Sequence, residues 1–159
     1  MPPNPFVDLA SLDVNKVLVD REGIYSVNPH RFEFQMLDGI IYLDHKKGLV
    51  AGYRHIRGDE YWVRGHIPGR PIFPGVLMIE TAAQLVSYYV QSDPSLAHGD
   101  FLGFGGVDGV KFRGTVVPGD TLFMIGKMVE IRSRRCIGAT QGFVNGQMVY
   151  EGLITGMWL

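Results

Sequence analysis

The sequence contains only one cysteine, Cys136, among its 159 residues. A lone cysteine excludes an intramolecular disulfide, and without a CxxC pair the usual cysteine-based zinc sites are excluded as well. The first residues also lack the charged and apolar regions of a secretory signal peptide. Together these absences favour a reducing compartment, and we expect a cytoplasmic protein.

Charge is also sparse in this chain. Asp, Glu, Lys and Arg make up 19% of the residues, and the formal net charge is −1 at pH 7. The chain has no basic run of the kind that binds nucleic acid, and no apolar run reaches the roughly 20 residues that a membrane helix needs. Hydrophobic residues make up 46% of the chain. With so little charge to cover the surface, we expect part of the apolar surface to be buried against a second subunit.

The length of the chain fits one domain with a substantial hydrophobic core. Residues 1–28 are mixed in character and rich in proline, so we expect an N-terminal extension with a short helix near Leu12–Val19. Two β-branched and aromatic runs follow, at residues 39–44 and 49–54. The short polar segment between these runs predicts a hairpin.

Residues 76–91 predict one long helix. The segment follows Pro74-Gly75 and contains neither glycine nor proline. At 1.5 Å per residue the helix would be about 24 Å long. Its residues are apolar on nearly every face, which is typical of a helix buried by its surroundings.

Four further runs with the character of strands follow a glycine-rich passage at residues 99–109. Pro118-Gly119-Asp120 and Asn145-Gly146 supply turns between them, and Asn-Gly is the strongest short hairpin signal. The runs are residues 110–117, 121–131, 136–144 and 147–159. Two strands before the helix and a four-stranded antiparallel meander after it predict an α+β domain, with a curved sheet wrapped around the helix.

Two titratable residues stand out near the start of the long helix. His66 lies in a loop rich in glycine and proline, where it could simply satisfy a loop carbonyl. Glu80 follows four apolar residues, and a glutamate is seldom buried unless it is paired. Glu80 could form a salt bridge to an arginine of the sheet. It could also be a buried acid that keeps its proton, with His66 as a general base, and such a pair suits addition or elimination of water.

The N-terminus of the helix offers a third element. The first backbone N–H groups of a helix have no partner within it and carry the positive end of the dipole. At Gly75, which has no side chain, a substrate carbonyl could approach these groups as it would an oxyanion hole. The alternative is that Gly75 merely completes a turn.

Three stretches of the chain carry a resemblance to a known family. "GHIPGRPIFPGVLMIETAAQ" (65–84), with "PHRFEFQMLDGI" (29–40) and "VDGVKFRGTVVPGD" (107–120), resembles the β-hydroxyacyl-acyl carrier protein dehydratases of the FabZ type. The resemblance implies a single hot-dog domain over residues 1–159. It also implies a dimer, or a trimer of dimers, whose sites each take the histidine and the glutamate from different subunits.

The resemblance also assigns roles to individual residues. It implies dehydration of (3R)-3-hydroxyacyl-acyl carrier protein to the trans-2-enoyl thioester in fatty acid biosynthesis, with no metal or redox cofactor. His66 would remove the α-proton, Glu80 would protonate the leaving hydroxyl, and the Gly75 N–H would polarise the thioester carbonyl. Further residues are expected to contact substrate or orient Glu80: Gln84, Ile67, Phe73 and Pro74.

An acidic acyl carrier protein needs a basic docking patch. Arg132, Arg134 and Arg135 are the candidates, and a solvated sheet edge protected by charge is an equal alternative.

Other functions within the same fold stay open. An acyl-coenzyme A thioesterase could use Glu80 to activate water, but His66 would then have no role. Hydratases with a closely spaced Asp and His match Asp59 and His66 poorly. A non-catalytic acyl-binding protein is expected to have lost His66 or Glu80, and this chain has both.

Overall fold

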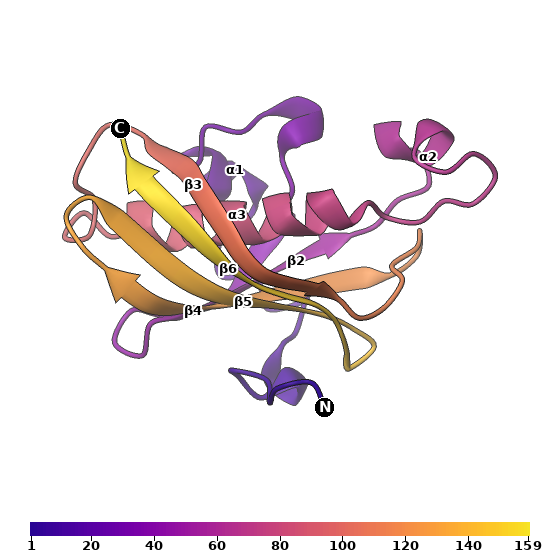
Figure 1. The fold of residues 1–159 in the computed structure, drawn as a ribbon, viewed down its shortest axis with the longest axis horizontal. Coiled ribbons are helices and arrows are strands. Elements are labelled where there is room, and N and C mark those ends of the chain that lie inside the picture. Colours follow the sequence, from indigo (N-terminus) through magenta and orange to yellow (C-terminus); the bar gives the residue numbers. More distant parts are fainter.

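Six strands form one antiparallel sheet that curls around a long helix, α3 (Gly75–Gln91), in the computed structural model of residues 1–159 (Figure 1). The strands lie in the order β1-β2-β4-β5-β6-β3, with the bounds β1 Gly39–Asp44, β2 Leu49–His55, β3 Leu102–Phe112, β4 Thr121–Ile131, β5 Arg135–Val144 and β6 Gln147–Trp158. Four short helical segments complete the fold: η1 (Leu9–Ser11), α1 (Arg21–Tyr25), η2 (Phe32–Phe34) and α2 (Tyr61–Gly65). The predicted α+β architecture is confirmed. None of these helices is long and apolar enough to cross a membrane.

Helix α3 is confirmed within one residue of its predicted start. Pro74 caps it with an extended backbone, and Ser92 ends it. Eleven of its 17 residues are buried, because the sheet and the segment before β1, which hydrogen-bonds to Gln84 and Ser87, together leave only one side uncovered. That side, which we call the open stripe, consists of Val76, Ile79, Glu80 and Ala83, and Val76 is 68% exposed. The open stripe is where a second molecule could cover the helix.

Both predicted hairpins are confirmed. Asp44 pairs with Leu49 at the end of the β1–β2 hairpin, and the Asp44 carboxylate accepts a hydrogen bond from the Lys47 N–H within the turn. Between β5 and β6, Asn145 has φ 49° and Gly146 has φ 75°. Two successive positive φ angles are the requirement of the two-residue turn that matches the twist of the strands.

The prediction for the glycine-rich passage was wrong. Strand β3 begins at Leu102, inside that passage, and pairs with β6 instead of β4. Residues 113–120 therefore cross the ends of β5 and β6 to reach β4, and Pro118-Gly119-Asp120 does not close a hairpin. A Cβ on Gly105 would lie 2.7 Å from Met157 of β6. Glycine thus permits close contact between the two strands. Because glycine has a low strand propensity, the sequence pattern did not predict a strand there.

The predicted helix at Leu12–Val19 is also absent. Asp13 accepts a hydrogen bond from the Asn15 N–H, and this local turn competes with a helix. The segment before α1 instead crosses the outer face of the sheet, opposite α3 (Figure 1). Gln141 of β5 holds it there, because its side chain accepts from the Phe6 N–H and donates to the Asn4 carbonyl, both at 3.0 Å.

Candidate active site

His66 ends the short helix α2 and faces solvent. Its Nδ1 lies 2.7 Å from the carbonyl oxygen of Ile72. Because a carbonyl oxygen only accepts hydrogen bonds, Nδ1 carries the proton in the neutral ring, and Nε2 keeps a free lone pair. The loop therefore prepares His66 to accept a proton at Nε2.

An open hollow of about 400 Å³ lies beside His66. We call it the His66 hollow; its lining includes His66, Ile72, Phe73, Gly75 and Phe112. Of the four predicted substrate contacts only Phe73 lines it. Pro74 is buried and Ile67 is exposed, and neither lines the hollow, while Gln84 lines a second hollow. Phe112 was not predicted from the sequence, because only the β3–β6 pairing brings it to the start of α3.

The N-terminus of α3 borders the same hollow. The N–H groups of Gly75 and Val76 donate to no group in the chain, whereas those of Leu77 and Met78 bond to the Pro74 carbonyl. A Cβ on Gly75 would lie 2.8 Å from the Phe112 ring. Two unpaired donors at the positive end of a helix can stabilise negative charge on a carbonyl oxygen.

Glu80 lies elsewhere, in a second hollow of about 190 Å³. We call it the Glu80 hollow; its lining includes Glu80, Gln84, His30, Leu102 and Gly156. The expectation of a glutamate buried in an apolar setting was wrong for the single chain. The Glu80 side chain is 24% exposed, because the open stripe of α3 is uncovered there, and the polar side chains of Gln84 and His30 lie near its carboxylate.

One oxygen of Glu80 accepts a hydrogen bond from Gln84 and lies near His30. Gln84 donates from Nε2 to Oε1 at 2.8 Å, and His30 Nε2 lies 3.6 Å from that atom. Burial lowers the pKa of His30, and the charge of Glu80 only partly opposes this, which favours the neutral ring. Glu80 Oε2 has no partner and stays available for chemistry. His30 was missed from the sequence because nothing local connects residue 30 with residue 80.

Gln84 is itself held firmly by the backbone. Its side chain is buried, accepts from the Met36 N–H at 2.9 Å and donates to the Phe34 carbonyl at 2.7 Å. The segment after η2 thus determines where the Gln84 amide points, and with it the position of the Glu80 carboxylate.

His66 and Glu80 do not meet in one chain. The fourteen positions between them include the start of α3, and each residue lines a hollow that excludes the other. His66 with the N-terminus of α3, and Glu80 with its neighbours, are therefore two separate halves of the candidate site on each molecule.

Comparison with known proteins identifies the family. The model of the FabA-like domain matches residues 28–153. A protein of Moorella thermoacetica named 3-hydroxyacyl-[acyl-carrier-protein] dehydratase FabZ is 34% identical over 134 residues, which are 84% of this chain and 92% of that relative. A relative of the same name from Clostridium botulinum is 35% identical over 133 residues, covering 84% and 91%. The chain belongs to the FabA-like family.

Solved structures show that this FabA-like chain has the hot-dog fold implied by the resemblance. The dehydratase heterocomplex ApeI:P from Xenorhabdus doucetiae superposes with a TM-score of 0.73 at 14% identity, over 86% of this chain and 90% of that one. The PaaI protein of E. coli superposes with a TM-score of 0.58 at 15% identity, over 74% and 80%. These likenesses concern the fold alone.

The three arginines of the FabA-like chain lie at the β4–β5 turn. Arg132 and Arg135 both contact Glu130, at 3.2 Å and 2.7 Å. Hydrogen bonding from Arg135 is the main reason that the pKa of Glu130 is lowered. Arg134 forms no side-chain ion pair, so it is the one arginine of the three whose charge is uncompensated.

Proposed function

We propose that this protein dehydrates (3R)-3-hydroxyacyl-acyl carrier protein to the trans-2-enoyl thioester and water, as a step of fatty acid biosynthesis. One observation carries the proposal: a histidine with a free Nε2 lies beside unpaired helix N–H groups, in a chain about one-third identical to proteins named FabZ. The buried, unpaired Cys136 suits the reducing cytoplasm that we propose as the location.

The base and the oxyanion donors act first. The thioester carbonyl oxygen accepts a hydrogen bond from the Gly75 N–H, which stabilises the enolate that forms when the α-proton leaves. His66 Nε2 takes that proton, while Nδ1–H remains bonded to Ile72. The electron pair of the broken C–H bond moves into the bond between the α- and β-carbons.

The acid completes the reaction. As the β-carbon loses its hydroxyl, Glu80 of a second copy donates a proton from Oε2, and water leaves. Gln84 hydrogen-bonds to Oε1 and so leaves Oε2 free to donate the proton. A proton then returns from His66 to Glu80 through exchange with solvent before the next turnover.

A two-fold dimer would unite the two halves. β3 is an edge strand of the sheet, and its exposed side chains include the apolar Phe104, Val107 and Phe112 beside the charged Asp108 and Lys111. A long apolar edge strand pairs readily with another chain. Pairing β3 with its symmetry mate would set the open stripe of each helix beside the partner, with the same surface used twice.

The proposed partner is the acidic acyl carrier protein, and we place its docking at Arg134. An exposed cation without an internal partner attracts an acidic protein with no ion pair to break first.

The test is a hydration assay, which runs the reaction in reverse and is followed by the ultraviolet absorbance of the enoyl thioester. Crotonyl-carrier and crotonyl-coenzyme A are compared at equal concentration. We expect turnover of both, with the higher kcat/KM for the carrier-linked thioester. Equal kcat/KM values would contradict the carrier assignment, and no turnover of either would favour an acyl-binding protein.

A further inference from the structure

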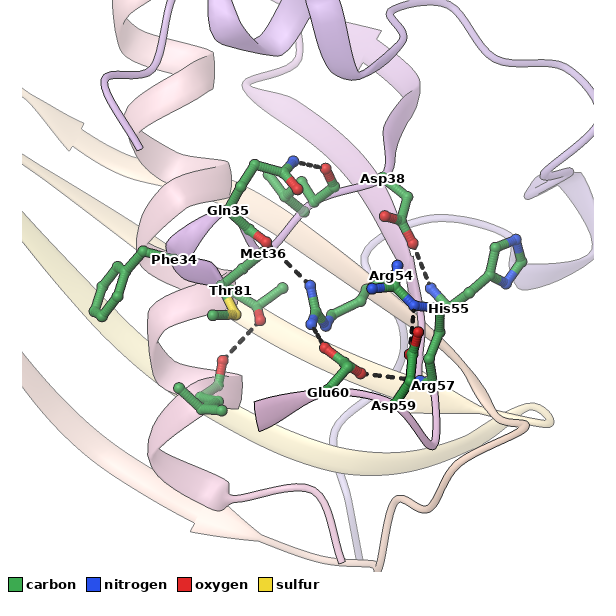
Figure 2. Close-up of polar contacts among 12 residues, drawn as sticks. Phe34, Gln35, Met36, Asp38, Arg54, His55, Arg57, Asp59, Glu60 and Thr81 are labelled. Carbon is green, nitrogen blue, oxygen red and sulfur yellow. Dashed lines mark hydrogen bonds and ion pairs between the residues drawn. The ribbon is translucent and has the colours of Figure 1, made fainter. Parts of the chain in front are cut away.

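Arg54 of β2 is a buried cation that lines neither the His66 hollow nor the Glu80 hollow. Figure 2 shows its polar contacts. Its guanidinium pairs with the carboxylate of Glu60, and the two side chains are only 8% and 6% exposed. The other carboxylate oxygen of Glu60 accepts from the Arg57 N–H at 2.9 Å. Removing two charges from water is unfavourable for stability, and an apolar pair of similar volume often stabilises a fold better. A structural role for the pair in the core is therefore a weak explanation for it.

The loop that carries His66 suggests what this pair does. Residues 64–71 are exposed without interruption, so their position depends on the two ends of the loop. One end is α2, whose N-cap residue is Glu60. The other end is Phe73, which packs edge-on against Trp62 of α2 with ring centroids 5.4 Å apart.

Arg54 contacts both of these ends. Its charged group pairs with Glu60, and its guanidinium carbon lies 5.6 Å from the centre of the Phe73 ring. Phe73 is followed directly by Pro74 and Gly75, so the same contact lies beside the unpaired N–H groups of α3. One side chain thus supports the base and the oxyanion donors together.

A third contact of Arg54 leads toward Glu80. Its NH1 group donates to the Gln35 carbonyl at 3.1 Å (Figure 2). Gln35 lies between Phe34 and Met36, the two residues whose backbone holds the Gln84 amide. The chain of contacts runs from Glu60 through Arg54 and residues 34–36 to Gln84 and Glu80.

We propose that Arg54 is a positioning residue of the reaction: through Glu60 and Phe73 it holds both ends of the His66 loop, and through Gln35 it supports the segment that orients Glu80. The inference rests on the proposed function, because it assigns Arg54 a role in that site. Arg54 touches neither hollow, so it acts only through the residues that do.

The test replaces the pair by apolar residues of similar size, in the double variant Arg54→Met/Glu60→Leu. Removing both charges leaves no unpaired buried ion, so the fold should survive. The matched control is Arg57→Met/Asp59→Asn, which removes the neighbouring exposed pair, whose side chains are 55% and 77% exposed. We expect kcat of the double variant to fall by about 10- to 100-fold with little change in KM, because small misplacements of catalytic groups lower the rate of the chemical step. The control should keep wild-type kcat.

Amide hydrogen exchange provides a readout that does not need turnover. In the double variant, residues 61–67 and 72–76 should exchange faster than in the wild type, while the strands keep their protection. The exchange rates of Arg54→Lys should lie between those of the wild type and the double variant. Lysine can pair with Glu60, but it lacks the planar guanidinium that reaches Gln35 and covers Phe73.

Wild-type kcat in the folded double variant, or faster exchange spread evenly over the sheet, would overturn the proposal. If the double variant does not fold, Glu60→Gln is judged by the same two measurements, because glutamine keeps the volume and the acceptor for Arg57. If the wild type itself shows no dehydratase activity, the proposed function fails, and exchange alone still decides whether Arg54 holds the loop.

Discussion

A single hydrogen bond decides which nitrogen of His66 can take a proton. The Ile72 carbonyl holds Nδ1–H at 2.7 Å, so Nε2 is the nitrogen left free for the proposed base. On Glu80, Gln84 hydrogen-bonds to Oε1, so Oε2 is the oxygen left free for the proposed acid. In both residues a neighbour selects the reactive atom.

The first prediction concerns substitutions that remove the proposed base and the proposed acid. His66→Ala and Glu80→Gln should each lower dehydration by about 10²–10⁴-fold, the usual contribution of a general base or acid. Both variants should keep the thermal midpoint of the wild type, since His66 is exposed and glutamine nearly matches glutamate in volume. His98→Ala, at another exposed histidine, is the control and should retain full activity. Near wild-type turnover in either variant would remove that residue from the mechanism.

Gly75 carries a second prediction at this scale. A methyl group there would meet the Phe112 ring at 2.8 Å, so Gly75→Ala should lower both stability and activity. Overpacking in a buried core destabilises by about 1–3 kcal/mol, and the loss here should be smaller because Phe112 is 52% exposed and can shift. Adding Phe112→Leu should relieve the contact and restore the midpoint of thermal unfolding, but kcat should stay low if the methyl also blocks the approach of the carbonyl. Recovery of kcat together with stability would show that Gly75 serves packing alone.

At the scale of the element, the β4–β5 turn divides its arginines between two roles. Arg132 and Arg135 neutralise Glu130, which makes them part of the turn. Exposed ion pairs of this kind contribute little to stability. Arg134 keeps its charge free for a partner, so the docking hypothesis concentrates on one residue.

The third prediction concerns that residue. Arg134→Glu should raise KM for carrier-linked substrate while leaving turnover of a short coenzyme A thioester unchanged. The effect should shrink with added salt, because exposed charges are screened beyond about 10 Å at 0.1 M. Lys46→Glu, in the exposed β1–β2 turn, is the control for a general change of charge. Equal losses on both substrates would indicate a structural role for Arg134.

At the scale of the whole molecule, one chain is an incomplete enzyme under the proposed mechanism. The His66 hollow and the Glu80 hollow are separate, the open stripe of α3 is uncovered, and β3 presents an apolar edge. In a dimer, the second copy would bring its Glu80 hollow to the His66 hollow, cover the open stripe and pair with β3.

The fourth prediction tests this sharing of sites. His66→Ala chains and Glu80→Gln chains, each inactive, are unfolded together and refolded. Random pairing makes about half of the dimers mixed, and each mixed dimer has one intact site of two. Activity should therefore recover to roughly a quarter of the wild-type value per chain. Activity that stays at the level of the single variants would show that each site is built within one chain.

The sequence alone determined the features whose signals are local. Pro74 and Ser92 mark the ends of α3 within one residue of the prediction, and the Asn145-Gly146 turn has the positive φ angles that those residue types favour. The residue types at His66 and Glu80 indicated addition or elimination of water, and the resemblance of residues 65–84 to the FabZ type implied dehydration. Turn chemistry, helix caps and motif spacing act over a few residues, so a linear sequence displays them.

Only the tertiary structure decided which distant segments meet. It paired β3 with β6, laid the segment before α1 across the sheet instead of forming a helix, and joined Arg54 to Glu60. It also placed His30 beside Glu80 and kept His66 away from both. These outcomes depend on contacts between residues far apart in the chain. Such contacts contribute more free energy than local conformational preferences do, and no short stretch of sequence contains both partners of one of them.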